Sequence, residues 1–281
     1  MAAICQHNNE TAKLCIRINT ARITVVDFLN CYEEQHIQVE QGLYLPEAVW
    51  LAQVGAITEL PGYEQGWFFV QDEAAQLVAR LLLPMPPGNC LDGCAGLGGK
   101  TATLATLLPR ESRVMAVEPD HRRQQLFREN MTRLGLGEIS LHAGSLGEYA
   151  AKTDSLFSAV LIDAPCSGLG VTGRHPDIRW QRQEEELMLF QSKQVAILQE
   201  AAPLVAPGGV LVYATCSTEP EENDAVVARF QAACPGFLLE DAALSLPAAA
   251  RHLVDAQGFL RTIPGLQGGD GFFGVRFRRS G

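Results

Sequence analysis

This chain of 281 residues lacks the marks of several large protein classes. No apolar run comes near the roughly 20 residues that a membrane-spanning helix needs, and residues 1–9 do not follow the basic-then-apolar order of a secretory signal. We therefore expect a cytoplasmic protein without a membrane segment. Internal repeats and low-complexity tracts are also missing, and with 47% apolar residues the composition is that of a folded chain.

Basic residues are scarce. The chain has 22 Lys and Arg against 32 Asp and Glu, a net charge of −10. This balance argues against broad, nonspecific nucleic-acid binding, which depends on positive charge, but it leaves room for a local basic face. Three clusters are candidates for such a face: Lys13, Arg17 and Arg22; Arg174, His175, Arg179 and Arg182; and Arg276, Arg278 and Arg279.

Paired metal-ligand motifs are missing too. The sequence has eight cysteines, of which Cys90 and Cys94 are four residues apart, but no second Cys or His pair with ligand spacing accompanies them. We therefore predict no metal site, zinc included. In a reducing cytosol the thiols are expected to stay free.

The apolar pattern predicts two units. Residues 1–62 are predicted to form a small α+β subdomain that contains a helix at 24–34. The side chains of this helix expected to face inward are Val25, Val26, Phe28 and Leu29. Over residues 63–281, strand-like runs alternate with helical patterns, which predicts a mostly parallel sheet with helices on both faces.

Two helices are predicted near the end of this alternation. Residues 184–205 have an apolar face at helical spacing, interrupted only by Gln194. Thr218 and Glu221 have the spacing of a capping box, which predicts a helix that starts near Glu219. The N-terminus of that helix is a candidate activator of a nearby thiol.

Two cysteines stand out among what is present. Cys166 lies in Asp163-Ala164-Pro165-Cys166-Ser167-Gly168 and Cys216 in Tyr213-Ala214-Thr215-Cys216-Ser217, and each motif follows an apolar strand-like run. In an open α/β sheet, active sites lie beyond the carboxyl ends of the strands. A free cysteine is often simply a core residue. Two thiols at equivalent places, one near an acid, favour covalent chemistry on an electrophilic ring instead.

A glycine-rich loop at 93–99 joins the strand that ends at Asp92 to a predicted helix. Its glycines permit close approach of a ligand, and the helix N-terminus offers free N–H groups. The spacing matches neither the Walker phosphate loop nor the Rossmann dinucleotide motif. Glu118 follows about twenty residues later, at the end of the next predicted strand, where a ribose-binding acid belongs in such folds.

Together these stretches resemble the Sun/Fmu (RsmB-type) family of S-adenosylmethionine-dependent RNA cytosine-5 methyltransferases. The resemblance runs from about residue 61 to the C-terminus. Its motifs are Gly66-Trp67 with Gln71-Asp72, the glycine-rich loop, Asn130 with Arg133-Leu134-Gly135, the two cysteine motifs, Arg174-His175-Pro176-Asp177-Ile178-Arg179-Trp180, Pro220-Glu221-Glu222-Asn223, and Gly269-Asp270-Gly271-Phe272-Phe273. It implies a class I (Rossmann-like) α/β methyltransferase with a mostly parallel seven-stranded sheet, preceded by a small ferredoxin-like or RRM-like subdomain.

The resemblance also implies roles for individual residues. Cys216 matches the nucleophile, Cys166 the cysteine that helps to release product, and Asp163 an acid that contacts both cofactor and target base. The residues that match the S-adenosylmethionine site are Cys94, Ala95, Gly96, Leu97, Gly98, Gly99, Lys100, Glu118, Ser145 and Asp163. The Arg-His-Pro-Asp-Ile segment resembles the ribosomal-RNA branch, so Arg174, His175 and Arg179 are predicted to bind RNA.

Three residues depart from the family pattern. Leu97 stands where the family usually has proline, and Glu118 replaces a usual aspartate. Ser145 stands where the family commonly has an aspartate that holds the adenine amino group. Because a neutral hydroxyl is a weaker acceptor than a carboxylate, we expect reduced cofactor affinity.

Several alternatives stay open. Ribosomal RNA is the first expected substrate and transfer RNA the second, and a cofactor-weakened RNA- or ribosome-binding relative is a further reading. A DNA cytosine methyltransferase would use Cys166 as its nucleophile. Many family members carry an additional N-terminal helical RNA-binding domain, for which we expect no room here. We expect a monomer with an accessory RNA-binding partner.

Overall fold

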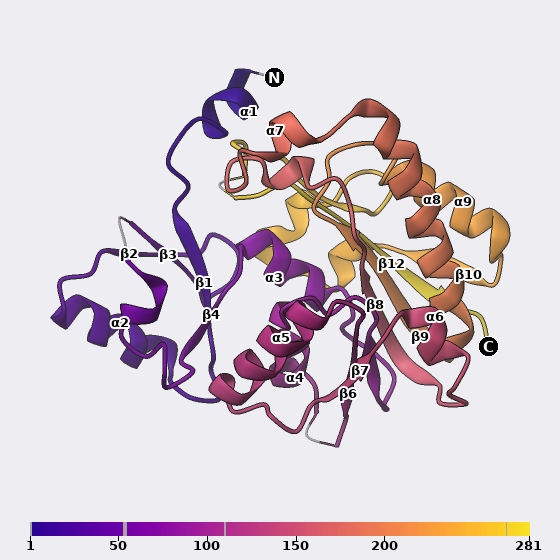
Figure 1. Ribbon diagram of the computed structural model, residues 1–281, viewed down its shortest axis with the longest axis horizontal. Helices are drawn as coiled ribbons and strands as arrows, with labels where there is room; N and C mark the ends of the chain where they lie inside the picture. The colour runs from indigo at the N-terminus through magenta and orange to yellow at the C-terminus, as the bar shows by residue number, and fades with distance from the viewer. Residues whose placement is uncertain (1, 53–54, 110, 268) are drawn as a thin grey trace.

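The computed structural model describes residues 2–52, 55–109, 111–267 and 269–281. A small antiparallel sheet lies beside a larger sheet that is covered by helices on both faces (Figure 1). No helix in the described ranges combines the length and apolar character needed to cross a membrane.

The small sheet has the strand order β2-β3-β1-β4, and all of its pairings are antiparallel. Its elements are α1 (Ala2–His7), β1 (Leu14–Ile18), α2 (Val25–Glu34), β2 (Val39–Gln41), β3 (Ala48–Leu51) and β4 (Phe68–Val70). Helix α2 begins after Thr24, whose side chain accepts from the N–H of Asp27, and it buries Phe28 and Tyr32 against the sheet. The inward orientation predicted for Val26 is wrong, because this side chain is 65% exposed.

The larger sheet confirms the predicted mostly parallel architecture. Its strands are β5 (Cys90–Asp92), β6 (Val114–Glu118), β7 (Ser140–Ala143), β8 (Phe157–Asp163), β9 (Val205–Thr215), β10 (Phe237–Glu240), β11 (Leu260–Thr262) and β12 (Phe272–Arg279). The strand order is β10-β12-β9-β8-β5-β6-β7, and β11 pairs with β12 beside this seven-stranded path. Strands β9, β8, β5, β6 and β7 run parallel. Strand β12 is antiparallel to β9, and β10 is antiparallel to β12, so β10 runs in the same direction as the five parallel strands.

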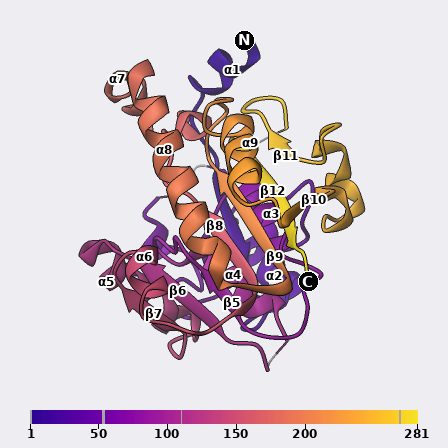
Figure 2. The same cartoon turned by 90° about the vertical axis from the view of Figure 1, so that its right-hand side faces the viewer.

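Helices pack on both faces of this sheet (Figure 2). One face carries α3 (Glu73–Arg80), α4 (Gly99–Leu107) and α5 (His121–Leu134), and the other α6 (Leu146–Ala150), α8 (Glu184–Ala201) and α9 (Asp224–Ala233). The short helix α7 (Ile178–Gln181) precedes α8, and the 3₁₀ turns are η1 (Ile57–Glu59), η2 (Leu169–Val171), η3 (Ala202–Leu204), η4 (Ala242–Leu244) and η5 (Ala248–Leu253). Alternate residues of β9 enter the two cores, with Val212 on one side and Leu211 and Tyr213 on the other, as the two-residue period of a strand requires.

Hydrogen bonds join the small sheet to the rest of the chain. The carboxylate of Glu73, in α3, accepts from the N–H groups of Leu43, Tyr44 and Leu45 at 2.7 to 3.0 Å. The amide of Asn19, which follows β1, donates to the carbonyl oxygens of Gly66 and Leu134. The boundary predicted at residue 62 stays a prediction, and the small sheet takes its fourth strand, β4, from beyond it.

The segment that follows β9 differs from its prediction. The capping box predicted at Thr218 and Glu221 is wrong, because the first helix after β9 is α9, which begins at Asp224. The hydroxyl of Thr218 donates instead to the carboxylate of Glu219. Consequently, within the described segment 216–224, no helix starts near Glu219 to activate the thiol of Cys216.

Helix α8 is shorter than the predicted 184–205, because Pro203 lies in η3 and Val205 begins β9. Its N-terminal boundary agrees with the prediction.

Candidate active site

The loops that follow β5, β6, β8 and β9 open into one cavity of about 650 Å³. The strand order reverses between β5 and β8, and such a switch point is where open α/β sheets bind ligands. The predicted site residues that line the cavity are Cys94, Ala95, Gly96, Leu97, Gly99, Lys100, Glu118, Ser145, Asp163, Cys166 and Cys216. Gly98 lies outside the lining: it has a φ of +90° at the start of α4, and a side chain there would meet Met131 and Phe127.

The two predicted catalytic cysteines face each other. Their sulfur atoms are 3.1 Å apart, within hydrogen-bond distance. The pKa of Cys166 is raised well above its usual range, first by the hydrogen bond to Cys216 and then by burial. The arrangement therefore favours a protonated Cys166, whose S–H can donate a hydrogen bond to the sulfur atom of Cys216.

Lys100 and Asp163 form an ion pair beside the cysteines. Their Nζ and Oδ2 atoms are 2.6 Å apart, and the two side chains are 11% and 27% exposed. Burial opposes the charge on Lys100, but the charge of Asp163 and its hydrogen bond, together with the charges of Cys216 and Asp92, raise the pKa of Lys100 overall. The ammonium also lies 5.1 Å from the ring centre of Phe272. The cavity thus holds a fixed positive charge next to an acid.

A buried acid helps to hold the glycine-rich loop in place. Glu118 is buried at the end of β6, and its Oε2 accepts from the N–H of Gly96 at 2.9 Å. A Cβ atom at Gly93 would stand 2.6 Å from Cδ1 of Ile162, so a side chain there would require Ile162 to shift. Nothing lies within 4 Å of a side chain built on Gly96, which leaves the loop open toward the cavity. Each oxygen of Glu118 keeps an acceptor site for a ribose hydroxyl.

The cavity also contains side chains that sequence reasoning did not place there. Arg182 and Phe190 line it, and the guanidinium of Arg182 lies 5.3 Å from the ring centre of Phe190. Arg182 donates to the carbonyl oxygen of Ser167 at 2.9 Å, which ties the end of α7 to the Cys166 loop. The basic cluster around Arg174 was the available signal for Arg182. For Phe190 the apolar face of α8 gave no sign of contact with a site.

Comparison with known proteins identifies the family. The profile described as "16S rRNA methyltransferase RsmB/F" matches residues 79–278. The chain belongs to this RsmB/F family. Residues 1–58 match a second profile, the ferredoxin-like domain of RsmF/B-like methyltransferases. The predicted family is therefore confirmed, and the small sheet is its ferredoxin-like domain.

Individual RsmB/F relatives and a solved structure agree with this membership. The chain is 34% identical over 280 residues to the probable ribosomal RNA small subunit methyltransferase B of Synechocystis, covering 99% of this chain and 63% of the relative. It is 36% identical to methyltransferase B of an Enterobacter strain, covering 96% and 61%. A methyltransferase homologue from Pyrococcus horikoshii is 26% identical with a TM-score of 0.81, covering 99% and 90%.

This chain spans about three fifths of the length of these curated relatives. RsmB/F proteins are S-adenosylmethionine-dependent methyltransferases, so the predicted cofactor class agrees with the family.

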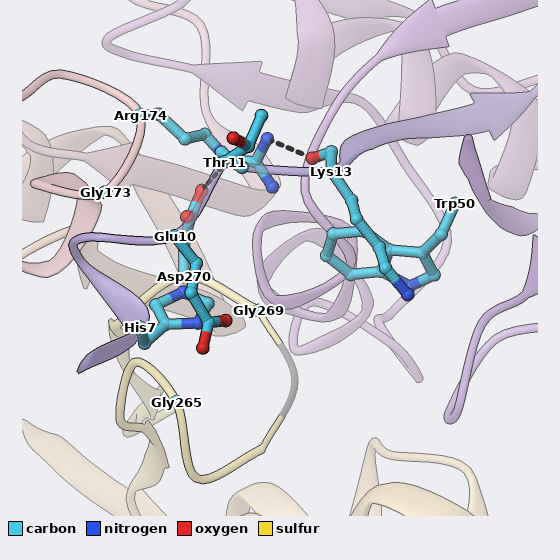
Figure 3. A pocket seen from close by; sticks show the side chains of 11 residues that line it. His7, Glu10, Thr11, Lys13, Trp50, Gly173, Arg174, Gly265, Gly269 and Asp270 are labelled. Carbon is cyan, nitrogen blue, oxygen red and sulfur yellow. Dashed lines mark hydrogen bonds and ion pairs between the residues drawn. The ribbon is translucent and has the colours of Figure 1, made fainter. Parts of the chain in front are cut away.

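Arg174, predicted to bind RNA, is engaged inside the protein. Its Nη2 and Nε atoms bond to the carboxylates of Asp72 and Asp270 at 2.8 and 2.7 Å. Its Nη1 donates to the carbonyl oxygen of Lys13, as Figure 3 shows at the edge of a cavity of about 250 Å³. Trp50 lies 5.8 Å from the guanidinium. These contacts engage three of the five N–H groups of the guanidinium and join segments around Lys13, Asp72 and Asp270 of this RsmB/F chain. The predicted RNA contact of Arg174 stays a prediction.

Replacing Arg174 with alanine is expected to destabilise the fold by about 3–5 kcal/mol, because it leaves two buried carboxylates without their cation. Burial, and then Asp72, raise the pKa of Asp270 to about 7 even with Arg174 present. A raised carboxyl pKa means that protonation stabilises the folded state, and that stability is lost as pH rises through the folded value. The loss in R174A should therefore be larger above pH 7 than below it, as urea unfolding would measure.

Arg179→Ala is the matched control, since Arg179 is exposed and lies in the same segment. Equal unfolding free energies for R174A and R179A would contradict the structural role of Arg174. His175 is exposed as well, and Arg174, His175 and Arg179 all stay predicted RNA contacts.

Ser145, the main departure from the RsmB/F pattern, caps a helix. Its Oγ accepts from the N–H of Glu148 at 3.2 Å, and its own N–H donates to the Glu148 carboxylate, a complete capping box for α6. Sequence reasoning did not predict this role. The hydroxyl keeps one further acceptor site, and Ser145 lines the same cavity.

Ser145→Asp is expected to tighten S-adenosylmethionine binding about fivefold. A charged hydrogen bond contributes about 1 kcal/mol more than a neutral one, and aspartate caps a helix as well as serine does. Titration calorimetry would measure the change. Ser155→Asp adds the same charge at an exposed loop position outside the cavity. An affinity gain of equal size in both variants would show a general charge effect and would argue against a direct contact.

Proposed function

We propose that this protein transfers the methyl group of S-adenosylmethionine to carbon 5 of a cytosine in RNA, through a covalent bond between Cys216 and the base. The observation that carries this proposal is the contact between the Cys166 and Cys216 thiols, 3.1 Å apart, in the cavity that the glycine-rich loop also lines. Ribosomal RNA is the proposed substrate, because the family is described by 16S rRNA. Transfer RNA is the second candidate.

The first step makes carbon 5 nucleophilic. The Cys216 thiolate adds to carbon 6 of the ring, and the resulting enamine character lets carbon 5 attack a methyl electrophile; covalent catalysis splits one hard step into two easier ones. S-adenosylmethionine, when bound, supplies that electrophilic methyl group. Asp163 hydrogen-bonds the base near ring nitrogen 3. Lys100, 2.6 Å from Asp163, adds a positive charge that offsets the negative charge developing on the ring.

The second step releases the product. Cys166, as thiolate, takes the proton from carbon 5, the ring double bond re-forms, and the carbon 6–sulfur bond breaks to return the Cys216 thiolate. Before reaction the hydrogen bond to Cys216 is the largest cause of the raised pKa of Cys166. Once the Cys216 sulfur is bonded to carbon 6, its negative charge is gone. Cys166 then loses its proton more easily and is ready to act as a base.

The RNA contacts belong to the same proposal. His175 and Arg179 are both exposed, and they lie in the segment between the Cys166 loop and α8. We propose that they contact the RNA backbone, that the protein acts as a cytoplasmic monomer, and that an accessory RNA-binding partner assists it.

Methyl transfer from labelled S-adenosylmethionine to ribosomal and transfer RNA tests the proposed function. Label recovered as 5-methylcytosine in ribosomal RNA is the expected result. Label in transfer RNA alone would replace the proposed substrate with the second candidate. Cofactor binding by calorimetry without transfer to either RNA would overturn the catalytic proposal in favour of an RNA- or ribosome-binding relative.

A further inference from the structure

A buried carboxylate lies directly behind the two cysteine loops. Glu222, in the turn between β9 and α9, is 0% exposed. Its Oε1 accepts from the N–H of Ser167 and from Nε2 of Gln194, both at 2.9 Å, and its Oε2 accepts from the Ser167 hydroxyl at 2.5 Å. No described residue forms an ion pair with it. A buried charge without a cation is costly. The three hydrogen bonds donated to the Glu222 carboxylate offset part of that cost.

These contacts bind the two cysteine loops together. Ser167 follows Cys166 in the chain, so the Glu222 side chain holds the Cys166 loop. The adjacent Asn223 holds the Cys216 loop, because its amide donates to the carbonyl oxygen of Ser217 at 3.0 Å. The Ser167 and Ser217 hydroxyls are 3.3 Å apart. Residues 222–223 therefore hold the two loops in the arrangement that places the thiols 3.1 Å apart.

The site requires a group that only accepts hydrogen bonds. Three donors converge on Glu222, and an ionised carboxylate has no proton of its own. A glutamine there would turn an NH₂ group toward Ser167 or Gln194. This explains Gln194, the single polar residue on the apolar face of α8: it is fully buried and donates to Glu222 and to the carbonyl oxygen of Pro165.

The charge of Glu222 also acts on the thiols. After the hydrogen bond to Cys216, burial and the charge of Cys216, the Glu222 carboxylate is a further cause of the raised pKa of Cys166. It thus favours the protonated form of this thiol.

We infer that Glu222 is a positioning residue that holds the Cys166 thiol against Cys216 and keeps their shared proton on Cys166, so that Cys216 is the thiolate. This inference rests on the proposed role of Cys216 as nucleophile. Glu222 touches no substrate; it acts through Ser167 and Cys166. The proton placement makes one cysteine reactive and holds the other in reserve for product release.

Competitive alkylation of the full chain with iodoacetamide tests the inference without RNA or cofactor. Mass spectrometry measures the labelling rates of Cys216 and Cys166 across neutral and alkaline pH. In the wild type, Cys216 should react faster. In Glu222→Gln the ratio of the two rates should fall about tenfold, the effect of one pKa unit, and labelling of Cys166 should begin at lower pH. A purely structural role would lower stability but leave the ratio in the folded fraction unchanged.

Two further variants complete the test. Gln191→Leu is the matched control. Gln191 is buried on α8, the helix that also carries Gln194, and it donates to the carbonyl oxygen of Glu221 without touching the Glu222 carboxylate. Ser167→Ala removes one hydrogen-bond donor to Glu222 with a minimal change in volume. It tests the inference if E222Q does not fold, and its ratio of Cys216 to Cys166 labelling rates should fall several-fold. A wild-type ratio in the folded variants, or faster labelling of Cys166 in the wild type, would overturn the inference. Failure of the proposed function differs: the labelling ratio then shifts as expected, but wild-type protein methylates no RNA.

Discussion

Cys216→Ala is expected to abolish methyl transfer and to leave the fold intact. Loss of the proposed nucleophile should lower the rate by about four orders of magnitude or more, because the remaining groups bind and orient but form no covalent bond. The fold should tolerate the change, since the carbonyl oxygen of Cys216, not its thiol, accepts from the N–H of Gly170. The measurement is transfer of labelled methyl to the RNA that the wild type modifies.

Cys234→Ala is the control for this experiment. Cys234 is a partly buried free thiol at the end of α9 and does not line the active-site cavity, so C234A should keep wild-type activity. Turnover by C216A at a wild-type rate would refute the assignment. Loss of activity in C216A together with trapping of Cys166 on 5-fluorocytosine would identify Cys166 as the nucleophile.

Cys166→Ala is expected to convert the enzyme into a covalent protein–RNA complex. In this variant the thiolate of Cys216 still adds to carbon 6 and carbon 5 is still methylated, but the base that removes the carbon-5 proton is missing. Because the carbon 6–sulfur bond cannot break until that proton leaves, most of the protein should end as an adduct. A denaturing gel with substrate RNA and S-adenosylmethionine would show the retarded band.

The double variant Cys166→Ala/Cys216→Ala serves as the control and should give no band, because the adduct needs the Cys216 sulfur. Normal turnover by C166A, with no adduct, would mean that a water molecule or another side chain removes the proton. The release role of Cys166 would then be rejected while the nucleophile assignment stands.

The position of the site was predictable from sequence because it follows from topology. Apolar runs before Asp163 and Cys216 indicated parallel strands, and the carboxyl ends of such strands meet at one edge of a sheet. Two cysteine motifs on neighbouring strands were therefore expected to converge, and β8 and β9 are indeed paired. This prediction needs only the positions of the strands and their parallel direction, which local sequence patterns indicate.

The supporting contacts were not predictable in the same way. Gln194 interrupts an apolar helix face, and periodicity predicts only which face is buried. It does not predict the polar groups that a buried side chain contacts. The ion pairs of Arg174 with Asp72 and Asp270 were not foreseen either, because they join segments about a hundred residues apart. Thr218 and Glu221 had the spacing of a cap, but α9 starts at Asp224, after Glu222 and Asn223 have bonded the cysteine loops. In each case the contact involves residues far apart in the chain, which a local pattern does not report.

The three N–H groups that converge on Glu73 affect whether the catalytic unit can be expressed without the ferredoxin-like domain. The family profiles end and begin on either side of residues 59–78, a natural place to cut an expression clone. Glu73 lies inside that interval and draws its donors from residues 43–45, in the ferredoxin-like domain. A catalytic fragment made without that domain would retain a carboxylate that is 3% exposed in the intact chain and would have none of these partners. We therefore expect the two homology units to fold cooperatively, and a methyltransferase engineered from this scaffold should carry both.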